Sequence, residues 1–252
     1  MEKDKISKDK STHFGYQKVD WSEKQHKVNM VFDSVSPKYD LMNDVMSLGL
    51  HRIWKKHAAF ISNIKPNSRI LDLASGTCDF SLKLAKRLNS EGMLVTSDIN
   101  INMLQQGRSR LQDAGYLNTT QIIANAEDLP FPDNYFDHIS IAFGLRNVRD
   151  KGKAIANMYR VLKPGGKILI LEFSKPAKCI TKLYDAYSFK IIPILGKLVC
   201  NDEDSYRYLV ESIRKHPDQE QLKSMLEENA FENCKYLNLC FGVVAIHTGH
   251  KF

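Results

Sequence analysis

The sequence lacks the features of a secreted, metal-binding or membrane-spanning protein. Its five cysteines form no C-x-x-C pair, which argues against a zinc site and against a disulfide framework. No apolar run approaches the roughly 20 residues that a membrane-spanning helix needs, and residues 1–17 lack the apolar core of a secretory signal. We therefore expect a protein of the reducing cytoplasm that holds no metal.

Four motifs of nucleotide and hydrolytic chemistry are also missing. The sequence has neither G-x-G-x-x-G nor G-x-x-x-x-G-K-[ST], which argues against a dinucleotide cofactor and against nucleotide hydrolysis. It has neither G-x-S-x-G nor H-E-x-x-H, which argues against a serine hydrolase and a zinc protease. The 252 residues are 43% hydrophobic and 26% charged, as in a soluble globular domain.

The net charge of +7 is compatible with two kinds of surface. The simpler interpretation is a solvated basic exterior, and the alternative is attraction to an anionic surface, either nucleic acid or a membrane. Residues 1–27 are polar and weakly patterned, and we expect them to form a flexible N-terminal tail.

The most informative stretch is RILDLASGTCDF, residues 69–80. An apolar run ends at Asp72, breaks at a turn that contains Gly76, and resumes as a helix at Asp79; the next apolar run ends at Asp98. Glycine lets the backbone approach a ligand, and a carboxylate at the next strand tip can accept the hydroxyls of a ribose. The pattern predicts a nucleoside-cofactor site at Gly76 and Asp98. Asp72 either joins this site or only caps the turn.

Strands and helices alternate up to residue 173, which predicts an α/β fold with a parallel sheet and right-handed crossovers. The expected strands are 70–73, 93–97, 120–124, 138–143 and 167–173. Two later runs flank Phe241-Gly242 and predict a hairpin. A mostly parallel sheet of about seven strands with an antiparallel C-terminal hairpin strand is typical of class I methyltransferases. That Rossmann-like fold has helices on both faces and binds S-adenosyl-L-methionine (SAM).

Apolar residues at helical spacing predict additions to this sheet. We expect one methyltransferase domain over residues 28–252, with an N-terminal helical substrate cap at 28–64 and a helical insertion at 178–216. The apolar stretch 178–200 is either ordinary core or a groove for a hydrophobic chain.

The ends of the third and fourth strands narrow the chemistry. Asn125-Ala126 follows the third strand, where a class I methyltransferase holds adenine. The fourth strand continues into Phe143-Gly144-Leu145-Arg146-Asn147, and not into the Pro-Pro-aromatic motif common in enzymes that methylate amino nitrogens. We therefore expect no nucleic-acid partner.

Four segments resemble the ubiquinone/menaquinone C-methyltransferase (UbiE) family. They are Tyr39-Asp40-Leu41-Met42-Asn43 with Ser47, His51 and Trp54; Phe143–Val148; Arg160–Gly166 with Glu172 and Ser174; and Asp204–Leu209. The resemblance extends from about Thr12 to Phe252. It implies methylation of a polyprenyl quinol ring carbon in both pathways: demethylmenaquinol to menaquinol, and 2-polyprenyl-6-methoxy-1,4-benzoquinol to its methylated product.

The resemblance also implies roles for individual residues. Those implied to contact SAM are Thr77, Asp98, Asn125 and Ala126. Arg146 and Asn147 would face the quinol, and Tyr39 would hydrogen-bond a ring oxygen. Because a guanidinium stays protonated, Arg146 would orient a water molecule or stabilise the quinolate rather than act as a base.

Three positions depart from the family pattern. Ser75 and Cys78 replace glycines, and Ala142 replaces a serine. One alternative is methylation of another lipid, such as a sterol or a phospholipid head group. Another is a non-catalytic SAM-binding scaffold in a quinone-biosynthesis assembly. A homodimer, contacts with other quinone-biosynthesis enzymes and peripheral contact with the inner face of the membrane stay open.

Overall fold

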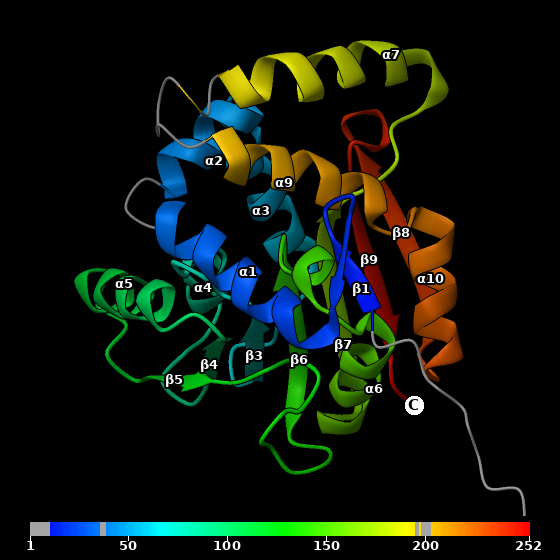
Figure 1. The fold of residues 1–252 in the computed structure, drawn as a ribbon. Helices are drawn as coiled ribbons and strands as arrows, with labels where there is room; N and C mark the ends of the chain where they lie inside the picture. The colour runs from blue at the N-terminus through cyan, green and yellow to red at the C-terminus, as the bar shows by residue number, and fades with distance from the viewer. Residues whose placement is uncertain (1–10, 36–38, 195–196, 198–202) are drawn as a thin grey trace, which may run out of the picture.

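The computed structural model describes residues 11–35, 39–194, 197 and 203–252. Within these residues the strands form a seven-stranded sheet in the order β5-β4-β3-β6-β7-β9-β8, and a separate hairpin of β1 and β2 (Figure 1). The strands of the sheet are β3 (Arg69–Leu73), β4 (Met93–Asp98), β5 (Thr119–Ile123), β6 (Phe136–Ala142), β7 (Leu162–Phe173), β8 (Glu232–Leu239) and β9 (Val244–His250). β5, β4, β3, β6 and β7 are parallel, and β9 is antiparallel to both of its neighbours. The predicted sheet is confirmed.

Helices cover both faces of the sheet, as the sequence predicts. The flanking helices are α3 (Leu50–Ile61), α4 (Asp79–Ala85), α5 (Ile101–Asp113), α6 (Lys151–Val161) and α10 (Gln219–Glu228). Successive side chains of a strand point to opposite faces. Ile168 and Ile170 of β7 therefore pack in one core with residues of α6 and α10. Leu169 and Leu171 pack in a second core with residues of α3 and α4.

A third core joins segments that are distant in the sequence. It combines α1 (Trp21–Val35), α2 (Tyr39–Ser47) and α9 (Glu203–Lys215), which lie over one end of the sheet in Figure 1. Its buried members include Val35, Met42, Met46, Tyr206 and Leu209. The helices α1, α2 and α9 thus form one cap. The domain boundaries expected from the sequence stay a prediction.

The apolar stretch at 178–200 is helical up to residue 194. It forms α7 (Lys178–Ala186) and the π-helical turn η3 (Tyr187–Ile191), and α7 lies across the top of the molecule in Figure 1. Residues 195–196 and 198–200 of this stretch lie outside the described residues.

The N-terminal region differs from the expected tail over residues 1–27. Residues 1–10 lie outside the described residues, but β1 (Ser11–Phe14) and β2 (Gln17–Asp20) form an antiparallel hairpin. The first helix begins at Trp21, ahead of the apolar stripe that starts at Val28.

Long-range contacts explain why local patterning missed this hairpin. The Phe14 ring stacks on Tyr208 of α9 with 4.1 Å between ring centroids. Gly15 has a φ of +58°, and a Cβ there would lie 2.2 Å from the Glu211 carboxylate, so glycine allows the turn to approach α9. Val19 is the one buried residue of β2, so the strand lacks the alternation that predicts a strand.

Asp218 forms the N-cap of α10, and removing it will destabilise the fold. Its side chain accepts a hydrogen bond from the Gln221 backbone N–H, and the Gln221 side chain accepts one from the Asp218 N–H. Asp218→Ala is expected to lower the free energy of unfolding by about 1 kcal/mol in urea titrations. Glu228→Ala, at the other end of α10, is the control. Equal unfolding midpoints for the two variants would contradict the capping role.

Candidate functional site

Three cavities adjoin one another between the cap and the sheet. The first cavity lies at the ends of β3, β4 and β6 beneath α1 and has about 750 Å³ of empty space, part of it open to solvent. The second cavity, about 660 Å³, lies between α2, α9 and the turn η2 (Leu145–Asn147). The third cavity, about 640 Å³, lies beside α7 and η3. The first and second share Phe32, Tyr39, Phe143 and Asn147. The second and third share Met46, Ser47, Phe173 and Leu209.

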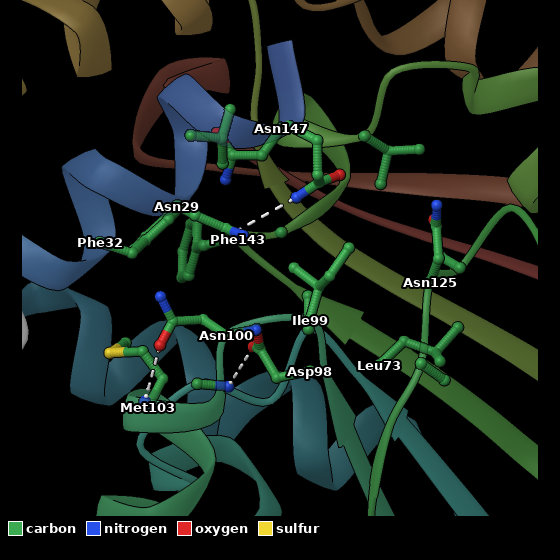
Figure 2. Close-up of a pocket in the computed structure, with 18 of the residues that line it drawn as sticks. Asn29, Phe32, Leu73, Asp98, Ile99, Asn100, Met103, Asn125, Phe143 and Asn147 are labelled. Atoms are coloured by element: carbon green, nitrogen blue, oxygen red, sulfur yellow. Dashed lines mark hydrogen bonds between the residues drawn. The ribbon is translucent and has the colours of Figure 1, made fainter. Parts of the chain in front are cut away.

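Asp98 and the turn at Gly76 form one side of the first cavity. The Gly76 N–H donates to Asp98 Oδ2 at 2.8 Å, and the Asn100 N–H donates to Oδ1 at 2.9 Å. Burial raises the pKa of Asp98, although these backbone donors oppose the shift. Gly76 has a φ of +52°, and its backbone borders the cavity. In Figure 2, Asp98 lies at the lower edge of this cavity and Asn147 at its upper edge.

Asn125, Ala126 and Glu127 line another side of the first cavity. The Glu127 N–H donates to Asn125 Oδ1 at 3.0 Å, which fixes the orientation of that amide. The buried Glu127 carboxylate accepts a hydrogen bond from Arg149 Nη2 at 2.8 Å. Sequence reasoning did not single out Glu127.

These groups fit the parts of SAM. The Asp98 carboxylate suits ribose hydroxyls, and the exposed backbone of the Gly76 turn suits a polar tail that approaches closely. The apolar side chains of Ile99, Met103 and Ala126 offer contacts to an adenine ring. The first cavity is therefore the candidate cofactor site.

Two of the predicted cofactor residues do not line the first cavity. Asp72 is fully buried and accepts hydrogen bonds from Ser81 Oγ at 2.5 Å and Ser140 Oγ at 2.7 Å. Thr77 Oγ1 donates to Asp40 Oδ1 at 3.1 Å and accepts from Arg110 Nη1 at 3.1 Å. Asp72 therefore connects the end of β3 to α4 and β6, and Thr77 connects the turn after β3 to α2 of the cap. Contact of either residue with a cofactor stays a prediction.

The departures at Ser75 and Cys78 leave the first cavity open, since neither residue lines it. Cys78 is buried against α5, where a Cβ on Gly107 would lie 2.5 Å from the thiol sulfur. The absence of a side chain at Gly107 thus makes room for the larger residue. Ala142 does line the cavity and offers no hydroxyl there.

Arg146, Asn147 and Tyr39 meet at the second cavity, and their contact with a quinol stays a prediction. Arg146 Nη1 lies 3.0 Å from Glu172 Oε1, and both side chains are buried. The Tyr208 hydroxyl donates to Asn147 Oδ1 at 3.1 Å. A buried ion pair and a buried hydroxyl therefore hold the Arg146 and Asn147 side chains at this cavity.

His51 also lines the second cavity, and its Nε2 lies 2.8 Å from Asp44 Oδ1. Burial and the nearby Lys55 lower the pKa of His51, and the Asp44 carboxylate, which accepts a hydrogen bond from His51, opposes this shift. The imidazole is then neutral at pH 7 and able to accept a proton.

The third cavity is almost entirely apolar. Its lining includes Leu48, Leu50, Tyr184, Tyr187 and Ile192, so α7 and η3 form part of its wall. Because it shares four residues with the second cavity, a molecule with a polar head and an apolar chain could occupy both.

α1 contributes cavity residues that the sequence analysis overlooked. Gln25, Val28, Asn29 and Phe32 all line the first cavity, and Gln25 Nε2 donates to Asn29 Oδ1 at 3.3 Å. Their i, i+3, i+4, i+7 spacing places them on one helix face. The sequence signal for this part of the site was the pair of amide side chains, Gln25 and Asn29, on an otherwise apolar helix face.

Known proteins resemble this chain over nearly its full length. The sequence model of the ubiE/COQ5 methyltransferase family matches residues 20–251. The Proteus mirabilis protein named "Ubiquinone/menaquinone biosynthesis C-methyltransferase UbiE" is 54% identical over 244 residues, which cover 96% of this chain and 97% of that protein. The Vibrio cholerae protein of the same name is 55% identical, with 96% and 94% covered.

A solved structure supports the fold. A SAM-dependent methyltransferase from Aquifex aeolicus superposes with a TM-score of 0.59 at 14% identity, covering 79% of this chain and 89% of that one. At this identity the likeness concerns the fold alone.

Asp72 should make stability depend on pH in a defined direction. Burial raises its pKa to about 6, and the Ser81 and Ser140 hydroxyls oppose the shift. A raised folded-state pKa contributes stability at low pH that is lost as pH rises through about 6. Relative to wild type, Asp72→Asn should therefore lose about 2 kcal/mol of unfolding free energy between pH 7.5 and pH 4.5.

Urea titrations at the two pH values measure this difference. Asp133→Asn, whose side chain is 68% exposed, controls for the loss of one carboxylate. The same Asp72→Asn effect at both pH values would contradict the shifted pKa.

Proposed function

The chain belongs to the ubiE/COQ5 methyltransferase family, and we propose that it transfers a methyl group from SAM to a ring carbon of a polyprenyl quinol in ubiquinone and menaquinone biosynthesis. The observation that carries this proposal is the wall of Phe32, Tyr39, Phe143 and Asn147 shared by the first two cavities. A cofactor in the first cavity and a ring in the second would meet at this wall.

The residues at the wall suit the chemistry of carbon methylation. SAM, when bound, supplies a methyl group attached to a positively charged sulfur. A quinol carbon becomes nucleophilic when the neighbouring hydroxyl loses its proton, and the charged Arg146 guanidinium stabilises the resulting quinolate. Tyr39 donates a hydrogen bond to a ring oxygen, and Asn147 orients the ring.

The bond changes balance without another reactant. The carbon–methyl bond forms as the sulfur–methyl bond breaks. The methylated carbon then loses its hydrogen as a proton, which restores the aromatic ring, and the ring oxygen regains the proton that it had lost. The products are the methylated quinol, the demethylated cofactor and one proton.

The apolar third cavity suits the polyprenyl tail. It continues from the second cavity through Met46, Phe173 and Leu209, and it has walls from α7 and η3. Removing an apolar chain from water is worth about 0.8 kcal/mol for each buried CH₂ group. This supports the groove interpretation of the stretch 178–200. Contacts with other quinone-biosynthesis enzymes and a homodimer stay predictions.

The alternatives make different use of the second cavity. A scaffold that only binds SAM has no need of the buried Arg146–Glu172 pair at its edge. Methylation of a sterol or a phospholipid head group would use the same cofactor site with another substrate. An assay with the purified protein separates these readings.

Purified protein should bind SAM, measured by titration calorimetry, and convert a demethylated quinol to its methylated form, measured by mass spectrometry. Arg146→Ala would leave the buried Glu172 carboxylate without its positively charged partner, so the test uses Arg146→Ala/Glu172→Gln, with Glu172→Gln alone as the control. The double variant should keep SAM affinity within threefold and lose at least 100-fold in turnover. Turnover equal to that of the control would remove Arg146 from the mechanism.

Tyr208 is expected to act as a positioning residue for Asn147. Tyr208→Phe keeps the ring that stacks on Phe14 but removes the hydroxyl that donates to Asn147. Turnover should fall about tenfold, the equivalent of one hydrogen bond, while SAM affinity and stability change little. Tyr236→Phe removes a hydroxyl bonded to Glu220, remote from the three cavities, and serves as the control. Unchanged turnover in Tyr208→Phe would show that Asn147 needs no such support.

A further inference from the structure

The third cavity reaches the surface between α2 and α3. Leu48 and Leu50 line it, yet they are 78% and 37% exposed. An apolar cavity that opens through exposed leucines offers an entrance for an apolar chain.

Two other exposed apolar side chains adjoin, in the sequence, residues that line this cavity: Leu183 precedes Tyr184, and Phe241 follows Cys240. Leu183 of α7 is 75% exposed, and Phe241 in the turn η4 (Cys240–Gly242) is 71% exposed. α7 has no buried residue, although apolar residues recur along it. Large exposed apolar groups that gather on one region of a protein are typical of an interaction surface.

Hydrogen bonds connect the elements that carry these side chains. The Ala177 N–H, at the start of α7, donates to the Phe241 carbonyl at 2.8 Å. The Tyr187 hydroxyl of η3 donates to the Met46 carbonyl of α2 at 3.0 Å. In Figure 1, α7 and the red turn between β8 and β9 lie at the same end of the molecule. The exposed side chains therefore belong to one region.

The charge of this region complements an anionic surface. Residues 175–190 contain four lysines, Lys175, Lys178, Lys182 and Lys190, all of them exposed, against the single carboxylate of Asp185. That carboxylate is paired with Arg214 of α9. Each lysine near an anionic bilayer contributes about 1 kcal/mol to attraction.

We propose that Leu48, Leu50, Leu183 and Phe241, together with these lysines, form a docking face for the surface of an anionic lipid bilayer. The proposal rests on the proposed function, since a polyprenyl tail gives the third cavity a reason to open toward lipid. The tail passes from the bilayer into the cavity without crossing water. None of the helices in the described residues is long and apolar enough to span a bilayer. In this proposal the docking face contacts the surface of the bilayer.

The test uses the full chain and sedimentation with vesicles of pure phosphatidylcholine or of phosphatidylcholine with 30% phosphatidylglycerol. Wild type should bind the anionic vesicles at least tenfold more tightly than the neutral ones, and high salt should weaken that binding. Two variants alter the docking face outside the cavity lining: Lys178→Glu/Lys182→Glu and Leu183→Ser/Phe241→Ser. Each should weaken binding at least tenfold. Lys86→Glu/Lys153→Glu makes the same change of charge just after α4 and on α6, and it should bind like wild type.

A second readout separates this proposal from the proposed function. Both docking-face variants should methylate a short-chain quinol in solution at the wild-type rate, but lose at least tenfold on a long-chain quinol embedded in anionic vesicles. Equal binding of all variants to anionic vesicles would overturn the docking face. Failure of wild type to bind the vesicles would also overturn it, and would favour delivery of the quinol by a protein partner. If the wild-type protein does not methylate the short-chain quinol, the proposed function is overturned instead.

Discussion

The structure depends on how closely the turns after β3 and β6 approach each other at one edge of the sheet. A Cβ on Gly144 would lie 2.4 Å from the Cβ of Ala74, so a side chain at position 144 would force the two turns apart. Phe143, just before it, has a φ of +59°, a conformation that costs free energy in an aromatic residue. This conformation places Phe143 at the border of the first and second cavities, and η2 brings Asn147 to the same wall.

The other half of this wall comes from the cap, so contacts between cap and sheet decide whether the site is complete. Asp40, next to Tyr39 in α2, accepts a hydrogen bond from Thr77 in the turn after β3 and pairs with Arg110 of α5. These contacts hold the start of α2 next to the first cavity, the candidate cofactor site. On the substrate side, the N-terminal hairpin packs on Tyr208, which in turn bonds Asn147. The cavity wall thus combines residues of the N-terminal helices with Phe143 and Asn147, and the Phe14–Tyr208 contact that supports it joins segments nearly 200 residues apart.

Local rules predicted the parts of the site that local geometry creates. The strand tip at Asp98 and the turn at Gly76 follow from an apolar run, a glycine and an acid, and the structure brings both to the first cavity. Asp72 follows the same local pattern, but the serine hydroxyls of Ser81 and Ser140 engage it below the turn. Only the packing of α4 and β6 decides that outcome.

The remaining parts arise from tertiary contacts that no short window of sequence contains. The hairpin at residues 11–20 escaped local rules because its four-residue strands carry little apolar pattern and Phe14 packs on Tyr208 of the distant α9. The third cavity exists because η3 and α7 pack beside α2 and α3, and its lining comes from five separate segments of the chain. The long apolar stretch at 178–200 indicated hydrophobic surface there but not the shape of that surface.

The central claim is that this site methylates the ring of a polyprenyl quinol. The most direct measurement is the quinone content of lipids extracted from a strain that lacks this protein, determined by liquid chromatography and mass spectrometry. The account predicts that the demethylated quinone precursors accumulate, and that the wild-type gene restores the methylated quinones whereas the Arg146→Ala/Glu172→Gln gene does not. An unchanged quinone profile in the deletion strain would contradict it.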